Sequence, residues 1–277
     1  MNLSVVIITF NEEANIARTL ASVQSLVADG KGEIIVVDSG SSDRTVEIAK
    51  SFGAKVFIEQ WKGFAAQKNS AIDKATGDWI LSLDADEEVS DVAQGFLDGF
   101  LFGTFGSDFR EFDGGVLLGR RNYFLGRWIR HGGFYRDAKL RLFVRGSGRF
   151  ADRSVHEDIE LKPGKSILNP SLHWTWMGNS AIDIIHHSYP TLSDYIEHMN
   201  RYSSLGAEMV VAKSNGQVRF SVINIVVRPL ATFIYNYFFR LGFLDGREGL
   251  LLHLYHAVYV SWKYAKAWEL SRPQKPK

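Results

Sequence analysis

The sequence predicts an α/β protein with a doubly wound, mixed sheet and a helical C-terminal appendage. Short apolar runs rich in β-branched residues alternate with stretches of helical spacing up to about residue 90, a pattern typical of parallel strands joined by helices. Polar and acidic residues follow these runs, at the edge where open α/β sheets bind ligands. From Pro190 onward the apolar spacing is that of helices.

Each element of the N-terminal part has its own signal. The expected strands are short and apolar, the expected helices carry apolar residues three or four positions apart, and polar residues or glycines separate them. Strands and helices are expected to alternate, beginning with a strand, at Val5–Thr9, Ala14–Leu26, Ile34–Asp38, Thr45–Phe52, Lys55–Ile58, Gly63–Lys74 and Trp79–Asp84. Four strands in such an alternation predict a parallel sheet.

Regular alternation fades after the fourth strand and returns as a long helix. Glycines and phenylalanines crowd residues 95–115, which favours a loop or a partly ordered helix. Thr191 and Asp194 have the spacing of a capping box, with Asp in place of the usual Glu or Gln, and the helix is expected to reach about Lys213. Further strands that complete a mixed sheet are expected at Gly115–Arg121, Lys139–Arg145 and Ser166–Leu172.

Composition places the chain in the ordinary globular class and excludes several kinds of site. Hydrophobic residues make up 45% and charged residues 23% of the 277 residues. The formal net charge of +1 gives no electrostatic case for nucleic-acid binding. The absence of cysteine excludes disulfides, zinc–thiolate sites and thiol nucleophiles. No cleavable signal peptide is recognisable after Met1, so we expect a cytoplasmic protein.

The last third offers two interpretations. Phe220–Phe239 is strongly apolar and aromatic, but Asn224 and Arg228-Pro229 interrupt it, which argues against a spanning helix. Leu250–Leu270 mixes Leu, Tyr and Trp with lysines, as in helices that lie in the headgroup region of a membrane. We expect peripheral contact with the inner membrane, and helices that only pack on the N-terminal domain are the alternative.

Two carboxylates two positions apart, Asp84 and Asp86, follow the buried run that begins at Trp79. Carboxylates at one strand end repel each other unless a cation lies between them. Oxygen ligands of this kind suit Mg²⁺ or Mn²⁺ bridging to a diphosphate. A solvated acidic turn is the alternative, and the pair alone does not decide between the two.

The turns after the first two strands carry side chains where a dinucleotide-binding fold needs glycines. Thr9-Phe10-Asn11-Glu12 replaces the Gly-x-Gly-x-x-Gly turn, which argues against a nicotinamide cofactor. Asp38 ends the second strand, where its carboxylate can accept hydrogen bonds from a base or a ribose. A strand-to-helix turn with Asp43 as a helix cap is the alternative for that loop.

Four polar segments follow one another in a specific order: Thr9-Phe10-Asn11-Glu12, Val37–Thr45, Gln67–Ser70 and Gly77–Glu87. Together they resemble the family-2 inverting glycosyltransferases of the GT-A fold, over essentially the whole N-terminal domain. The resemblance implies a GT-A-type catalytic domain over residues 1–176 and a helical C-terminal region over residues 177–277. It also implies a nucleotide-sugar donor and Mg²⁺ or Mn²⁺ as cofactor.

The resemblance implies roles for individual side chains at the strand ends. Asp38 is expected to contact the base, Lys68 to approach the nucleotide or its diphosphate, and Asp84 to bind near the ribose. Asp86 is expected to help hold the metal. The other residues expected to line the nucleotide pocket are Thr9, Asn11, Glu12 and Ala85.

Later segments are similar to a narrower branch. Gly126–Tyr135, Arg141-Leu142-Phe143 and Val155-His156-Glu157 resemble the lipopolysaccharide inner-core β-1,4-glucosyltransferases. This implies transfer of a hexose, glucose from UDP-glucose, to a lipopolysaccharide-core or other lipid-linked saccharide at the cytoplasmic face of the membrane. A polyprenyl-phosphate or protein acceptor stays open, as does a non-catalytic protein that binds nucleotide sugars or glycans.

An inverting transfer needs one general base for the acceptor hydroxyl. Glu157 is the best candidate and Asp158 is its rival, since an ordinary carboxylate is ionised at neutral pH and can accept a proton. The alternative is an exposed acidic turn. No zinc site is expected at His186 and His187, because adjacent histidines point differently and no Cys or spaced His completes a set.

Arginines are dense between Arg120 and Arg153. They would suit a phosphorylated acceptor, because a guanidinium group binds phosphate with two parallel hydrogen bonds. Lys139 and Arg141 alternate along an expected strand, so the solvated face of that strand is the alternative interpretation.

Overall fold

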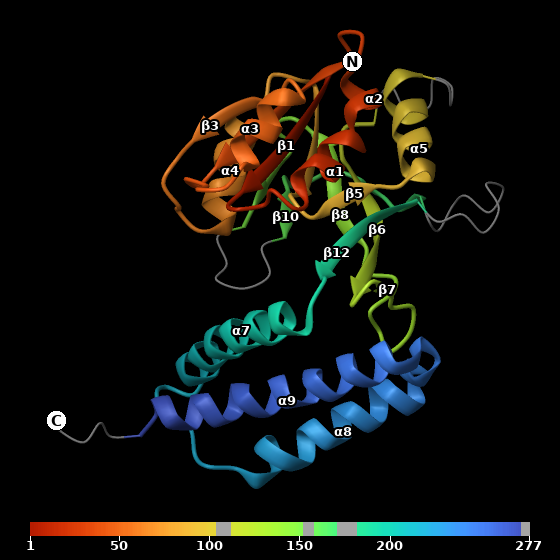
Figure 1. Ribbon diagram of the computed structural model, residues 1–277. Helices are drawn as coiled ribbons and strands as arrows, with labels where there is room; N and C mark the ends of the chain where they lie inside the picture. Colours follow the sequence, from red (N-terminus) through yellow and green to blue (C-terminus); the bar gives the residue numbers. More distant parts are fainter. Residues whose placement is uncertain (104–111, 152–157, 171–181, 273–277) are drawn as a thin grey trace. The chain divides into compact units, whose positions relative to one another are not determined.

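The chain forms two compact units in a computed structural model that describes residues 1–103, 112–151, 158–170 and 182–272 (Figure 1). Unit 1 comprises Met1–Arg121 and Asp137–His186, and unit 2 comprises Asn122–Arg136 and His187–Lys277. The predicted α/β class, with a mixed sheet and a helical C-terminal region, is confirmed. The boundary expected at residue 176 lies outside the described residues.

A mixed sheet forms the centre of unit 1. Its parallel strands are β1 (Leu3–Thr9), β2 (Gly32–Asp38), β3 (Lys55–Ile58) and β4 (Trp79–Asp84). The sheet continues through β8 (Lys139–Val144), β6 (Gly115–Phe124), β12 (Asp183–Tyr189) and β5 (Glu87–Val89). The strand order is β3-β2-β1-β4-β8-β6-β12-β5, and β8 pairs antiparallel with both β4 and β6.

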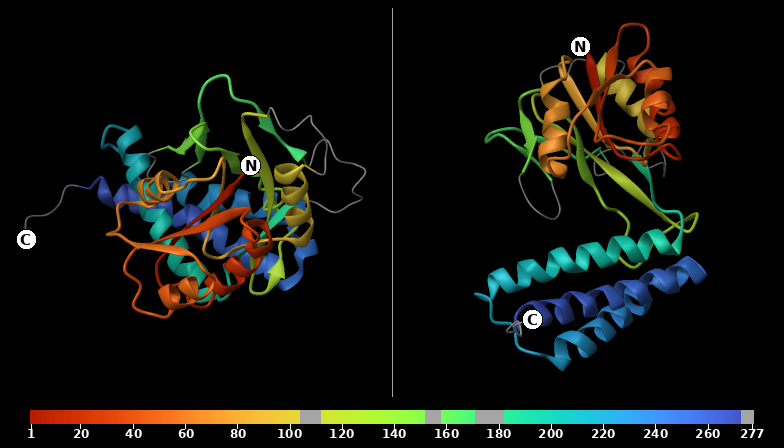
Figure 2. Two further views of the ribbon diagram at one scale, coloured as in Figure 1. Left: turned by 90° about the horizontal axis from the view of Figure 1, so that it is seen from above. Right: turned by 60° about the vertical axis from the view of Figure 1, so that its left-hand side comes forward.

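Helices cover both faces of this sheet, because alternate side chains of a strand point to opposite sides. Val5 belongs to one core cluster, together with residues of α1 (Ile16–Ala21) and α5 (Asp91–Phe102). Val6, its neighbour in the chain, belongs to the other cluster, with residues of α4 (Phe64–Asp73). Figure 2 shows helices on either side of the strands of unit 1. This is the doubly wound arrangement that the sequence predicts.

The helix expected at Ala14–Leu26 is instead two short helices, α1 and α2 (Gln24–Val27). Ser22 lies at the break. Its hydroxyl donates to the carbonyl oxygen of Thr19 at 2.7 Å and accepts from the backbone N–H of Val89 at 3.0 Å. Serine side chains that bond to nearby backbone groups compete with the helix in this way. The next helix, α3 (Thr45–Ser51), has nearly its predicted bounds.

Several short elements had no clear signal. A hairpin of β9 (Gly148–Phe150) and β10 (Ile159–Leu161) lies beside the main sheet, and β7 (Arg127–Trp128) pairs with β6. The strand expected at Ser166–Leu172 is represented by the shorter β11 (Ile167–Leu168), which also pairs with β6. Strands of two or three residues are too short to show a period of two. The first part of the glycine-rich stretch belongs to α5, which begins after Ser90, whose hydroxyl accepts from the backbone N–H of Ala93 at 3.3 Å.

Unit 2 is helical. Its first helix, α7 (Leu192–Lys213), begins with the predicted capping box of Thr191 and Asp194. A second helical stretch consists of the π-helical segment η3 (Ile223–Val227), α8 (Arg228–Ile234) and the π-helical segment η4 (Tyr235–Phe239). After the short η5 (Gly242–Asp245), α9 (Gly246–Leu270) packs against both α7 and α8. Every helix in the described part of the chain is too short or too polar to cross a membrane.

Candidate active site

The carboxyl ends of three parallel strands meet in unit 1. In the sheet register, Thr9 of β1 is opposite Asp38 of β2, and Ile8 of β1 is opposite Asp84 of β4. Residues far apart in the sequence therefore lie together at one edge of the sheet. This is the edge at which open α/β sheets bind ligands.

Asp38 is fully buried and fixes the loop that follows it. Its carboxylate accepts hydrogen bonds from Thr9 Oγ1 at 2.8 Å and from Ser41 Oγ at 2.5 Å. It also accepts from the backbone N–H groups of Gly40 at 2.9 Å and Ser41 at 2.8 Å. Gly40 has a φ of 92°, a conformation that glycine adopts without strain. The Asp38 side chain is thus a loop anchor, and its contact with a base stays a prediction.

Asn11 and Glu12 join the loop after β1 to the loop after β2. The Asn11 side-chain oxygen accepts from the backbone N–H of Ser42 at 2.9 Å, and the Glu12 N–H donates to Thr45 Oγ1 at 2.7 Å. Burial raises the pKa of Glu12, and the nearby carboxylates of Asp86 and Asp84 raise it further, against a hydrogen bond from Asn15. Glu12, Asp84 and Asp86 therefore lie near one another at this edge of the sheet.

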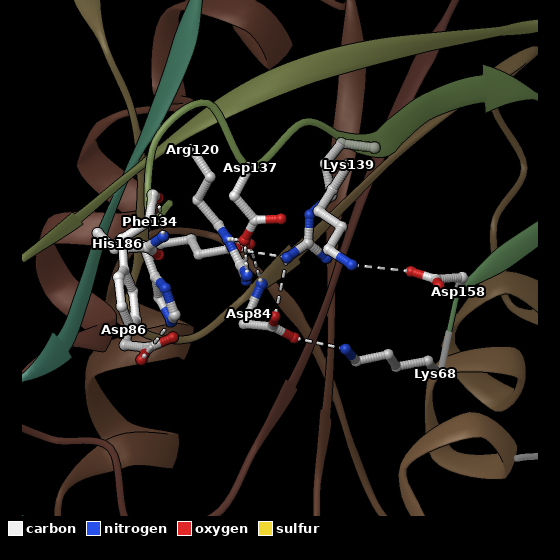
Figure 3. Close-up of polar contacts among 12 residues, drawn as sticks. Lys68, Asp84, Asp86, Arg120, Phe134, Asp137, Lys139, Asp158 and His186 are labelled. Atoms are coloured by element: carbon white, nitrogen blue, oxygen red, sulfur yellow. Dashed lines mark hydrogen bonds and ion pairs between the residues drawn. The ribbon is translucent and has the colours of Figure 1, made fainter. Parts of the chain in front are cut away.

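Asp84 is held by two buried cations (Figure 3). Its Oδ1 lies 2.7 Å from Lys68 Nζ, and its Oδ2 lies 2.9 Å from Arg141 Nη2. Although burial raises the pKa of Asp84, the charges of Lys68 and Arg141 hold it well below its usual range. The carboxylate is therefore ionised and bonded on both oxygens, which leaves it poorly placed to act as a metal ligand.

Glu87 completes this charge network from the start of β5. It is fully buried, accepts from the backbone N–H of Asp84 at 3.0 Å, and forms a short contact with Arg141. Arg120 Nη1 lies 3.6 Å from the same carboxylate and also pairs with Asp137. Arg141 is not on a solvated strand face, as one interpretation of the sequence had it, because only 5% of it is exposed.

Asp86 has a different partner. The side chains of Asp86 and His186 point toward each other (Figure 3), with Asp86 Oδ2 3.2 Å from His186 Nε2. Strand β12 brings the histidine there, because His186 is opposite Glu87 in the antiparallel pairing with β5. Burial lowers the pKa of His186, but the Asp86 carboxylate outweighs it and raises the pKa above its ordinary value. The sequence argued against a metal site at His186 and His187, because nothing in it indicated that His186 lies beside Asp86.

The donor set at this corner fits a divalent cation that also binds substrate phosphates. No group of three or more potential metal ligands occurs among the residues that the structure places. Mg²⁺ and Mn²⁺ commonly take only one or two protein ligands and complete their shell with water and phosphate oxygens. Asp86 can supply one carboxylate oxygen, and His186 can supply one imidazole nitrogen when a metal ion displaces its proton. Asp84 is engaged with its own cations.

Three further residues were predicted for the site: Ala85, Glu157 and Asp158. Ala85 is buried, and its carbonyl oxygen accepts from Thr19 Oγ1 at 2.6 Å, so its backbone fixes the turn between the two aspartates. Asp158, directly before β10, is half exposed, and its Oδ1 lies 3.1 Å from Lys139 Nζ. Glu157 lies outside the described residues.

Known proteins resemble this chain over most of its length. Residues 4–157 match the family model described as Glycosyl transferase family 2. An uncharacterized glycosyltransferase of Rickettsia bellii is 31% identical over 97% of this chain and 87% of its own length. The lipopolysaccharide core biosynthesis glycosyltransferase LpsC of Rhizobium meliloti is 28% identical over 96% of this chain and 92% of its own length. A crystal structure of S. aureus TarS 1-349 in complex with UDP covers 96% of this chain and 90% of its own, with 16% identity and a TM-score of 0.48.

Proposed function

The chain belongs to glycosyl transferase family 2, and we propose from this premise that it moves a hexose, glucose from UDP-glucose, to a lipid-linked saccharide. The arrangement that carries the proposal is the pairing of two unlike groups at the carboxyl ends of parallel strands. One group is the carboxylate of Asp86, which is paired with His186. The other consists of the two cations Lys68 and Arg141, which flank Asp84. Together they offer a metal site and positive charge for a diphosphate.

The nucleotide is proposed to bind over the loops that Thr9, Asn11, Glu12 and Asp38 hold together. Their mutual hydrogen bonds fix the loops before any ligand binds. Preorganised loops reduce the entropy that binding costs. Asp84 and Ala85 lie between this pocket and the proposed metal site, with Lys68 beside the diphosphate.

Asp86 and His186 are the residues that would hold Mg²⁺ or Mn²⁺. Such an ion would neutralise charge that develops on the leaving diphosphate. Lys68 and Arg141 contribute positive charge from the other side of Asp84. Because they are already fixed by buried ion pairs, they need little reorganisation during the reaction.

The transfer is a single displacement. The acceptor hydroxyl oxygen attacks the anomeric carbon, the bond from that carbon to the diphosphate oxygen breaks, and UDP leaves with the electron pair. The hydroxyl proton passes to a carboxylate, for which we propose Glu157, with Asp158 as the rival. In-line attack of this kind inverts the anomeric configuration.

The acceptor is proposed to be a lipopolysaccharide-core saccharide at the cytoplasmic face of the inner membrane, with the protein attached peripherally. The relation to LpsC supports this class of acceptor. The test is transfer of labelled glucose from UDP-glucose, with Mn²⁺, to extracted lipopolysaccharide core and, in parallel, to polyprenyl phosphate. Labelling of the core supports the proposal. Labelling of polyprenyl phosphate alone would move the protein to a different acceptor class.

Glu157→Gln separates a catalyst from a protein that only binds nucleotide sugars. We expect this variant to bind UDP like the wild type but to transfer glucose at least about a hundredfold more slowly. Equal transfer rates for the two proteins would exclude Glu157 as the base. Asp158→Asn tests the rival assignment, since a loss of transfer in this variant with full activity of Glu157→Gln would make Asp158 the base.

A further inference from the structure

The helical stretch of unit 2 from residue 222 to residue 239 carries its large apolar side chains on the outside. Its exposed apolar residues fall into two adjacent rows, each with a spacing of four. We call them the apolar stripe: Val222, Val226, Leu230, Ile234 and Phe238 in one row, and Ile223, Val227, Ala231, Tyr235 and Phe239 in the other. The large side chains among them are between 39% (Ile234) and 75% (Phe239) exposed.

The π-helical segments keep the stripe on one side. In an α-helix of 3.6 residues per turn, a row of residues four apart winds slowly around the axis. The wider turns of η3 and η4 shift the row in the opposite sense. The two rows therefore stay on one face along the whole stretch.

The inner face of the same stretch is the more polar one. Asn224, Thr232 and Asn236 are half-buried there, interspersed with Ile225, Phe233 and Tyr237. Ser261 of α9 donates to the carbonyl oxygen of Ile225 at 2.8 Å. A helix on the surface of a water-soluble domain has the reverse arrangement, with its apolar face inward. A large contiguous patch of exposed apolar side chains on a protein surface marks a contact with a partner or a membrane. The face is therefore suited to an apolar environment rather than to water.

Charge identifies the kind of partner. Unit 2 holds fourteen Lys and Arg residues against six Asp and Glu residues, whereas unit 1 holds eighteen against twenty-five. From residue 209 to residue 244 the only charged residues are four basic ones, and all four are exposed. They are Lys213, Arg219, Arg228 and Arg240. The next acid, Asp245, is buried.

Basic residues at both ends of an exposed apolar helix complement an anionic lipid surface. The apolar side chains enter the boundary between headgroups and acyl chains, while long basic side chains reach the phosphates. We propose that the apolar stripe is the face by which the protein docks on a membrane containing anionic phospholipid, with the helical stretch lying in the membrane plane. The proposal deepens the proposed function, on which it rests for a lipid-linked acceptor.

The stripe also narrows the expected membrane region. The sequence favoured Leu250–Leu270, yet that segment lies in α9, whose Leu252, Ala257 and Val260 are buried in unit 2. Within α9 only Leu250, Leu254 and Leu270 are large, exposed apolar residues, whereas the preceding helical stretch carries a continuous row of them.

Vesicle binding by the full chain tests the proposal. Wild type is expected to bind phosphatidylcholine vesicles that contain phosphatidylglycerol. Ile223→Ser should weaken this binding about tenfold or more, because it removes a side chain that would be buried in lipid. Ile167→Ser is the matched control, since Ile167 is an isoleucine of unit 1 with 58% exposure, against 67% for Ile223.

A second pair of variants tests the role of charge. Arg219→Gln should weaken binding to the anionic vesicles about fivefold and leave binding to pure phosphatidylcholine unchanged. Lys50→Gln, an exposed position on α3 of unit 1, is the control. Failure of the wild type to bind the anionic vesicles, or equal binding by Ile223→Ser and Ile167→Ser, would overturn the proposal.

Two further measurements separate docking from catalysis and from self-association. Ile223→Ser should transfer glucose to a delipidated core oligosaccharide at the wild-type rate without vesicles; if the wild type binds vesicles but cannot use this acceptor, the proposed function fails and the docking face stands. Light scattering without lipid should give a monomer. A wild-type dimer that Ile223→Ser dissociates, with vesicle binding unchanged, would show that the stripe is a contact between two copies.

Discussion

His186 Nε2 lies 3.2 Å from Asp86 Oδ2, although the two residues are one hundred positions apart in the chain. The pairing of β12 with β5 creates this proximity and places an imidazole beside the second aspartate of the Asp-x-Asp corner. The first aspartate has its own pair of cations, Lys68 and Arg141. The two carboxylates therefore have separate roles: Asp84 anchors a buried charge network, and Asp86 faces His186.

His186→Ala is expected to weaken Mn²⁺ binding about tenfold or more, because it removes one of the two proposed protein ligands. Electron paramagnetic resonance of free Mn²⁺ measures this without any turnover. His187→Ala is the control, since neighbouring residues of a strand point to opposite sides. If the two variants bind Mn²⁺ with the same affinity, His186 does not take part in the metal site.

Arg141→Met is expected to lower the free energy of unfolding by about 3 to 5 kcal/mol, because it leaves the buried carboxylate of Glu87 and one oxygen of Asp84 without their partner. Urea denaturation measures the loss. Arg149→Met serves as comparison, since Arg149 pairs with Asp73 on the surface and such pairs contribute about 1 kcal/mol or less. Similar losses for both variants would contradict the structural role assigned to Arg141.

Unit 2 is expected to lose stability as the pH falls from about 6.5 to about 4 because of His253. Burial and the neighbouring His256 lower the pKa of His253 to about 4, against the partial effect of Asp245. In the unfolded chain the histidine pKa is about 6.5, so between about pH 6.5 and about pH 4 the unfolded chain binds the proton more readily than the folded chain. The His253 contribution to stability is therefore fully present above about pH 6.5 and is lost as the pH falls toward about 4.

The His253 contribution between pH 7 and pH 5 is about 2 kcal/mol. Neither ring nitrogen of His253 has a hydrogen-bond partner within the described residues, so an apolar replacement is tolerable there. His253→Leu should therefore lose less stability than the wild type when urea unfolding is compared at pH 7 and pH 5. The change in stability between pH 7 and pH 5 will not vanish in His253→Leu, since burial also lowers the pKa of His256. An identical loss of unfolding free energy between pH 7 and pH 5 in both proteins would refute the role of His253.

The sheet of unit 1 was predictable because its strands are apolar, short and separated by helices of recognisable period. Lys55–Ile58 and Trp79–Asp84 have their predicted bounds. The proximity of Thr9, Asp38 and Asp84 also follows from sequence alone, since parallel neighbours end at the same edge. The prediction of one continuous helix over Ala14–Leu26 is wrong, because the helix breaks at Ser22, whose side chain bonds to the backbone.

The charge network was not predictable, because long-range antiparallel pairing creates it. Lys139 and Arg141 are two positions apart in the sequence, so both look like residues on the solvent-exposed face of one strand. Only the packing of β8 beside β4 places it against Asp84 and Glu87. His186 is likewise uninformative until β12 pairs with β5. The apolar stripe was expected as apolar sequence, but its outward orientation depends on how the helices of unit 2 pack.

The most direct test of the central claim is glucose transfer from UDP-glucose to lipopolysaccharide core by wild type, Asp86→Ala and Asp91→Ala, followed by mass spectrometry of the product. Asp91 is an exposed acid in the first turn of α5 and provides the control. The account predicts one added hexose with wild type and Asp91→Ala in the presence of Mn²⁺, and a loss of about a hundredfold or more with a folded Asp86→Ala variant. Normal turnover by Asp86→Ala would contradict the account.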